Sequence, residues 1–298
     1  MSDEAIDVPR VGRWPKTKPI AARRSRAVLK QAGLHLVLLV VAAYFAFPFF
    51  WLVTSSLKDA TQIFVFPPVL WPNPIKWINY PVAFEEMHFA HYLVNTLTVT
   101  VPSVVGTLIS SAMPAYAFSR LNWPGRDLVF VLVLGTMMLP FAVTMIPVYL
   151  LFHALGWIGT YLPLIVPHFF GGAFFIFLLR QFFLSIPIEI SEAAEIDGAN
   201  ELRIFLQMII PLSRPVIATT VLLSFIWTYN EFLQPLIYLT NDSMYTLALG
   251  IVTFVGSNIQ KWELLMAAAV MYCVPNIVLY FFAQKHFIKG IATTGMKS

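Results

Sequence analysis

The 298-residue chain is 58% hydrophobic and only 11% charged, and its mean hydropathy is +0.75. These values lie far from those of soluble globular proteins and predict an all-α integral membrane protein. The net charge of +4 does not indicate a nucleic-acid partner, because the basic residues are distributed as in a membrane protein. The single cysteine, Cys273, excludes a disulfide framework and a cysteine-based metal cluster.

The chain begins with a basic segment, residues 1–33, which holds eight Lys and Arg residues. A cleaved signal peptide is the competing interpretation, but the apolar run that follows is longer than a signal-peptide core of about 7–15 residues. We therefore expect an uncleaved first helix behind a cytoplasmic tail that can contact anionic headgroups.

Six apolar segments follow that are long enough to cross a bilayer, since a spanning helix needs about 20 residues. They cover residues 34–53, 92–118, 128–152, 161–179, 212–239 and 263–283. Together they predict a six-span membrane domain over residues 34–283, followed by a cytoplasmic tail over residues 284–298. Pro140 and Pro147 interrupt the third span, and broken helices often line substrate paths.

The basic residues predict the orientation of these spans. With the N-terminus inside the cell, the inner segments hold 16 Lys and Arg residues and the outer segments hold only 3. This asymmetry favours both termini in the cytoplasm. It also places the polar loop between the fourth and fifth spans, residues 184–215, on the cytoplasmic side.

That loop has the pattern of two short helices joined by a turn. Gly198 stands where a first helix should stop, because glycine adopts positive φ at little steric cost. Asn200 can cap a second helix, which we expect to end at Pro211. In the second helix, one predicted apolar face consists of Leu202, Phe205, Leu206 and Ile209.

The same loop resembles the EAA signature of permease subunits in ATP-binding-cassette importers. The residues that match are Glu192, Ala193, Ala194, Asp197, Gly198, Ala199, Phe205, Pro211 and Pro215. The sequence departs from the signature at Met208, where the family usually has isoleucine, an apolar residue of similar volume. The resemblance implies that Glu192 to Ala199 couple the membrane domain to an ATPase subunit.

Polar residues within the predicted spans suggest a translocation path. Glu231 lies in the fifth span, about 28 Å along a continuous helix from Leu212, and an ionisable residue in a bilayer usually faces a cavity or a partner. Asn230 and Asn276 are further polar groups at membrane depth. For these asparagines interhelical hydrogen bonding is the default role, and solute contact is the alternative. Pro140 completes this set of path candidates.

Residues 227–238, WTYNEFLQPLIY, resemble a motif of maltose-type carbohydrate permeases. The resemblance implies one half of the translocation pathway of a carbohydrate importer in a prokaryotic inner membrane. It further implies a second homologous permease, two ATPase subunits and an extracytoplasmic binding protein as partners. ATP and Mg²⁺ would be bound by the ATPase subunits, and this chain would need no cofactor of its own.

Enzyme motifs are missing from the sequence, which contains no Gly-Lys pair and therefore no Walker A loop, and no GxSxG or HExxH motif. His88 and His91 could begin a metal site, but no third ligand is evident. Three alternatives remain open: a permease for a non-sugar solute such as a glycerophosphate compound, a secondary transporter, and a membrane enzyme that acts on lipid-linked sugars. The last would need clustered carboxylates or histidines, which we do not find.

Overall fold

The computed structural model describes residues 20–257 and 261–294, and within these ranges all regular secondary structure is helical. Most of the predicted basic tail, residues 1–19, and the last residues, 295–298, lie outside the described part. The chain divides after Trp51 into two units, which are described separately.

The first unit ends within the long helix α1 (Ile20–Ser56), which crosses the boundary between the units. From Lys30 to Phe50 every residue of α1 is exposed, although the segment is strongly apolar. An exposed apolar helix of this length is typical of a membrane span that faces lipid. The predicted first span is therefore confirmed as a helix.

Four helices of the described chain are long and apolar enough to cross a membrane, and the number rises to six if each of two bent helix pairs is one span. The four helical segments are Lys30–Ser56, Phe89–Arg120, Leu162–Ser185 and Trp262–Phe282. The bent pairs are Arg126–Thr136 with Phe141–Ala154, and Glu201–Leu212 with Arg214–Tyr229. Taken in chain order, these segments overlap the six predicted spans.

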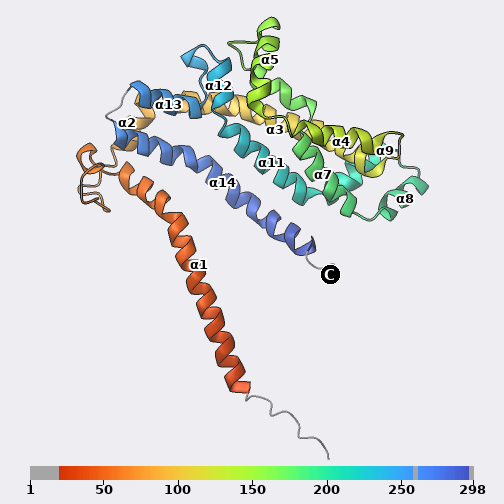
Figure 1. Cartoon of the computed structure of the whole chain (residues 1–298), viewed down its shortest axis with the longest axis horizontal. Helices are drawn as coiled ribbons and strands as arrows, with labels where there is room; N and C mark the ends of the chain where they lie inside the picture. Colours follow the sequence, from red (N-terminus) through yellow and green to blue (C-terminus); the bar gives the residue numbers. More distant parts are fainter. Residues whose placement is uncertain (1–19, 258–260, 295–298) are drawn as a thin grey trace, which may run out of the picture. The chain divides into compact units, whose positions relative to one another are not determined.

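The second unit is organised around one long helix, α3, which packs against α7 and α11 (Figure 1). The α-helices of this unit after α1 are α2 (Asn79–Glu86), α3 (Phe89–Arg120), α4 (Arg126–Thr136), α5 (Phe141–Ala154), α6 (Leu162–Ile165), α7 (Ala173–Ser185), α8 (Glu189–Ile196), α9 (Glu201–Ile204), α10 (Ile210–Leu212), α11 (Arg214–Tyr229), α12 (Leu233–Tyr238), α13 (Leu247–Ser257) and α14 (Trp262–Thr294). Short helical turns of other types are η1 (Ala60–Gln62), η2 (Val166–Phe170), η3 (Phe205–Ile209) and η4 (Asp242–Met244).

Within this unit, α8 and α9 lie at one end, and α2 and α13 lie towards the other (Figure 1). Separate apolar clusters support the two ends. One cluster packs α3 and α7 against α8 and α9 and includes Tyr116, Phe183 and Ile204. Another packs the start of α3 against α11 and α13 and includes Phe89, Tyr229 and Leu247. The helix α3 therefore contributes to the core at both ends.

Two predicted spans are bent rather than straight. The third bends by 94° between α4 and α5, at Pro140, whereas Pro147 lies inside α5 without ending it. The fifth bends by 80° at Ser213, between Pro211 and Pro215. Helix α11 then ends at Tyr229, so the prediction of one continuous helix over residues 212–239 is wrong. Prolines explain both bends, because each removes a backbone donor and clashes with the preceding turn.

The segment between α1 and α3, which the sequence places outside the cell, is folded. Asn79 donates its side-chain amide to the backbone oxygens of Ser56 and Lys58, both at 2.9 Å. Lys76 forms an ion pair with Asp59 at 2.7 Å and, with a hydrogen bond from Thr61, lowers the pKa of the Asp59 carboxyl to about 2. These contacts tie the end of α1 to α2.

Candidate functional site

The predicted helix-turn-helix in residues 184–215 is present. Helix α8 ends at Ile196 with Asp197 as its C-cap, and Gly198 adopts a φ of 82°. The backbone N–H of Ala199 donates to the oxygen of Ala194 at 2.9 Å, which closes the helix end. Asn200 then accepts a hydrogen bond from the backbone N–H of Arg203 at 2.9 Å and caps α9. We call the segment from α8 to α10 the coupling element.

One face of the coupling element is buried against α3 and α7. Helix α8 turns Ser191 and Ala194 inwards and leaves Glu192, Ala193 and Asp197 exposed. The small side chain of Ala194 allows α8 to lie close to the rest of the element. The EAA residues are thus divided between a packing role, at Ala194, and an exposed surface.

The apolar face predicted for the second helix is only partly correct. Phe205 and Ile209 are buried as expected, but Leu202 is 60% exposed and Leu206 is 53% exposed. The buried face is instead the one that packs against α3 and α7, and it includes Ile204, which lay outside the predicted face and is fully buried. A π-helical turn, η3, follows α9 directly.

Exposed apolar side chains occur on the outer surface of the coupling element. Ile196, the last residue of α8, is 87% exposed, and Leu202 and Leu206 are more than half exposed. Glu192 and Glu195 are exposed on the same helix as Ile196. Exposed apolar groups rimmed by charge are typical of a surface that contacts another protein.

Two arginines link the end of α3 to α7 by hydrogen bonds beside this element. Arg120, the last residue of α3, donates to the backbone oxygens of Phe183 and Ile186, both at 2.6 Å. Arg180 of α7 donates in return to the oxygen of Phe118 at 3.1 Å and stacks over the ring of Phe130 at 4.1 Å. These guanidinium groups satisfy carbonyls that helix ends leave without intrahelical partners. Sequence analysis counted both arginines only as inner charges.

A second link joins the coupling element to α3. The Tyr116 hydroxyl donates to the carboxylate of Glu201, at the start of α9, and the Tyr116 ring lies 5.0 Å from the ring of Phe205. Helix α3 therefore holds the coupling element through Tyr116 and the end of α7 through Arg120.

At the other end of α3, Glu231 lies in a break between two helices rather than within one. Its Oε1 atom accepts hydrogen bonds from the backbone N–H groups of Leu233 at 2.9 Å and Gln234 at 3.1 Å. The carboxylate thus caps α12, and the predicted position of Glu231 along a continuous helix is wrong. No hydrogen bond to the second oxygen, Oε2, is present within the described chain.

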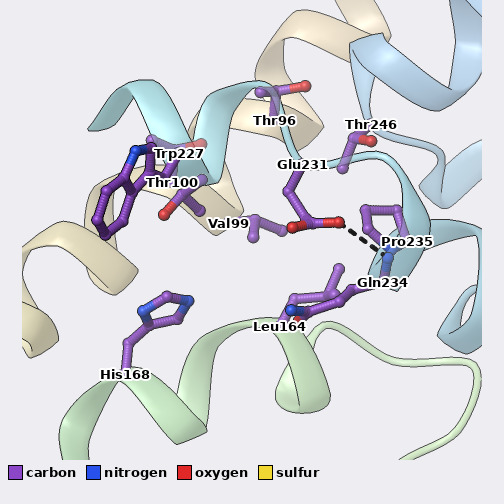
Figure 2. Close-up of a pocket in the computed structure, with 11 residues that line it drawn as sticks. Thr96, Val99, Thr100, Leu164, His168, Trp227, Glu231, Gln234, Pro235 and Thr246 are labelled. Atoms are coloured by element: carbon purple, nitrogen blue, oxygen red, sulfur yellow. Dashed lines mark hydrogen bonds between the residues drawn. The ribbon is translucent and has the colours of Figure 1, made fainter. Parts of the chain in front are cut away.

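Glu231 faces a cavity of about 210 Å³ where five segments of the chain meet. Figure 2 shows its carboxylate among side chains from α3, from α6 and η2, from α11, from α12 and from Thr246, the residue before α13. The cavity is lined by Thr96, Val99, Thr100, Leu164, His168, Trp227, Thr228, Glu231, Gln234, Pro235 and Thr246. None of these side chains from the described chain is Lys or Arg.

The wall of this cavity contains polar groups with unused hydrogen-bonding capacity. The hydroxyls of Thr100 and Thr246 are buried and have no partner within the described chain. His168 has one neighbour for its ring, the Thr107 hydroxyl, at 3.1 Å from Nδ1. A buried polar group without a partner costs about 1–3 kcal/mol.

The other predicted path residues do not line the cavity. Asn230 accepts hydrogen bonds from Tyr272 at 2.7 Å and from Asn276 at 3.3 Å, so the two asparagines bridge α11 and α14. This is the interhelical role considered from the sequence. Pro140 is exposed at the start of α5. Sequence analysis missed His168, Gln234 and the threonines, which only the fold brings to Glu231.

Comparison with known proteins finds similarity to membrane components of transport systems. The profile of a family described as "Binding-protein-dependent transport system inner membrane component" matches residues 106–293. The chain is 31% identical to the probable ABC transporter permease protein YurM of Bacillus subtilis, over 95% of this chain and 92% of the relative. It is also 31% identical to the osmoprotective compounds uptake permease protein GgtD of Synechocystis, over 89% of this chain and 92% of the relative.

A third relative is the arabinooligosaccharides transport system permease protein AraQ of Halalkalibacterium halodurans, which is 30% identical over 86% of this chain and 93% of the relative. Among solved structures, the chain is similar to part of a bacterial ABC transporter involved in the import of the acidic polysaccharide alginate. That match has a TM-score of 0.76 and 26% identity, and it covers 92% of this chain and all of the other.

Proposed function

Because the chain belongs to the family of inner-membrane components of binding-protein-dependent transport systems, we propose that it forms half of the translocation pathway of a carbohydrate importer. It is a multi-pass permease subunit of an ATP-binding-cassette importer and not an enzyme. The carbohydrate assignment draws on relatives that carry arabinooligosaccharides or alginate and on the polar cavity around Glu231.

The proposed complex contains a second, homologous permease, two ATPase subunits and an extracytoplasmic solute-binding protein. ATP and Mg²⁺ would be bound by the ATPase subunits. The observation that carries this proposal is the coupling element, which has an exposed apolar residue, Ile196, next to a rigid turn at Gly198. An 87% exposed isoleucine at a capped helix end is suited to insertion into a groove on an ATPase subunit.

The fold suggests how a movement of the ATPases reaches the cavity. Glu201 of the coupling element is bonded to Tyr116 on α3, and Arg120 ties α3 to the end of α7. The same helix α3 carries Thr96 and Thr100 in the wall of the cavity. ATP binding would close the ATPases, shift the docked element and switch the pathway between inward-facing and outward-facing states. No covalent chemistry on this chain is required.

We further propose that both termini and the coupling element lie in the cytoplasm. In that orientation the cavity is close to the outer end of α3, since Thr96 and Thr100 lie about 10–17 Å from its first residue at 1.5 Å per residue. The folded segment between α1 and α3 would then face the binding protein.

Site-directed cross-linking tests this function. In a Cys273→Ser background, an Ile196→Cys variant should form a disulfide or bismaleimide cross-link with a cysteine introduced along the docking groove of an ATPase subunit in native membranes. A cysteine at Asn200 should react with impermeant reagents only from the cytoplasmic side, and one at Asn73 only from outside. Labelling of position 200 from outside, or the absence of any cross-link from position 196, would contradict the proposal.

A further inference from the structure

We propose that the cavity around Glu231 is a subsite for one ring of a neutral, hydroxyl-rich solute and that it discriminates against anions. The inference rests on the proposed function, because it assigns a substrate class to the same pathway. It also separates two possibilities that the relatives leave side by side, a neutral oligosaccharide and an acidic one.

The polar groups of the cavity match the hydroxyls of a sugar. Glu231 uses Oε1 to cap α12 and retains Oε2 as an acceptor, and Figure 2 shows the carboxylate directed into the space between the surrounding segments. The Gln234 side chain adds an amide that both donates and accepts, and the His168 ring adds a further polar atom. Hydroxyl groups donate and accept hydrogen bonds, so they can satisfy each of these groups at once.

An aromatic side chain completes the site. Trp227 lines the cavity and is 50% exposed, so part of its indole is free to contact a ligand. Its ring lies 5.1 Å from the rings of both Phe174 and Phe175, which hold it in place. The C–H face of a sugar ring packs well on an indole ring, and the other groups of the cavity supply the polar contacts.

Three features disfavour an anion. No Lys or Arg side chain of the described residues lines the cavity. The charge of Glu231 repels a second negative group placed in the same cavity. The first N–H groups of α12, which could otherwise attract an anion, are already paired with Glu231.

The cavity, which is partly open, is also small. Its volume is about 210 Å³. That is the scale of one monosaccharide ring, so the remainder of an oligosaccharide would extend into the space shared with the partner permease. A cationic solute could pair with the Glu231 carboxylate. A cation site of the cage type, however, is built from several aromatic faces. Among the described residues that line the cavity, only Trp227 and His168 have an aromatic ring.

Saturation-transfer NMR on the purified permease–ATPase complex tests this inference without the binding protein, whose own selectivity would mask that of the cavity. The probes are arabinotriose as the neutral solute, an alginate trisaccharide as the anion and choline as the cation. The key variant is Glu231→Gln, because glutamine keeps an oxygen to cap α12 and removes only the charge. Asp127→Asn is the matched control, since Asp127 is an exposed carboxylate in α4, outside the cavity lining.

We expect saturable transfer to arabinotriose in the wild-type complex and none to the other two probes. Glu231→Gln should weaken arabinotriose binding about tenfold, the loss expected for a hydrogen bond to a charged group, and should raise the relative binding of the alginate probe. Asp127→Asn should change neither.

Preferred binding of alginate or choline, no saturable transfer to arabinotriose, or an unchanged selectivity in Glu231→Gln would overturn the inference. The proposed function is tested by a separate measurement on the same preparation, the stimulation of ATP hydrolysis by the loaded binding protein. If that stimulation is present while the NMR result is adverse, only the substrate class is wrong. If it is absent, the proposed function fails.

Discussion

The coupling element and the Glu231 cavity lie near opposite ends of α3 and have opposite polarity relative to their surroundings. In the coupling element, apolar side chains such as Ile196 are exposed, and nearby charges are used to hold backbone oxygens. In the cavity, apolar helices enclose polar groups that have few partners within the described chain. Each region therefore indicates what completes it: a protein surface for the first and a hydrated solute for the second.

The comparison also shows how the two regions are connected. Helix α3 carries Tyr116 and Arg120 at one end and Thr96 and Thr100 towards the other. A helix held at both ends can transmit displacement, which is a physical basis for coupling between the two regions. A movement of the coupling element can therefore reach the cavity.

The largest effect is expected at the turn of the coupling element. Gly198→Val should abolish the coupling of ATP hydrolysis to uptake, because valine is strained at a φ of 82° and would move Ile196. No neighbouring atom lies within 4 Å of the point where a Cβ would stand at this position, so the backbone conformation alone is affected. Uptake and ATP hydrolysis in proteoliposomes measure the result.

Gly125→Val is the matched control for that variant. Gly125 has a φ of 84° and equally open surroundings, but it caps α4 outside the coupling element. It should incur similar local strain and retain coupled transport. Equal loss of coupling in both variants would show that strain, and not the docking surface, accounts for the effect of Gly198→Val.

A smaller effect is expected at Arg120, which links α3 to the end of α7. Arg120→Lys should destabilise the junction of α7 and α8 by about 2 kcal/mol, because an ammonium group cannot reproduce the two guanidinium contacts to Phe183 and Ile186. Hydrogen exchange should increase over residues 183–187. Arg126→Lys is the control, since the hydrogen bonds of Arg126 within the described chain go to Leu121, Asn122 and Asp127. Exchange at residues 183–187 should not respond to it.

The smallest effect is expected in the cavity wall. Thr100→Val should leave thermal stability unchanged or slightly higher, because it removes a buried hydroxyl that has no partner in the described chain. Thr107→Val, further along the same helix, should cost about 1–2 kcal/mol, because His168 loses its hydroxyl neighbour. Thermal unfolding of the purified complex compares the two. Equal destabilisation would mean that the Thr100 hydroxyl is satisfied within the protein.

Much of the fold follows from the sequence, because hydropathy and capping are local properties. The apolar segments, the turn at Gly198 and the cap at Asn200 can all be predicted from neighbouring residues. The bend at Ser213 agrees with the helix end expected at Pro211, but the break after Tyr229 cannot be predicted, since the hydropathy pattern continues across it. Which face of the second coupling helix is buried depends on its packing against α3 and α7, which is not a local property.

The candidate site can be predicted only in part, for a similar reason. Glu231 stands out because a carboxylate in an apolar segment is unusual, but its capping of α12 depends on the break after Tyr229. His168 and Thr100 reach the cavity from helices far apart in the sequence. The partners of Arg120 are backbone oxygens, which no pattern of side chains reveals.

The most direct test of the account measures binding-protein-stimulated ATP hydrolysis and solute uptake on the same proteoliposomes for two variants, Ile196→Asp and Glu231→Gln. We predict that Ile196→Asp lowers ATP-coupled uptake of every solute equally. The conservative variant Ile196→Leu should keep uptake close to that of the wild type. Glu231→Gln should alter the preference between neutral and anionic solutes and leave stimulated hydrolysis intact. If Ile196→Asp changes solute preference, or if Glu231→Gln abolishes stimulated hydrolysis, the division of coupling and selectivity between the two regions is contradicted.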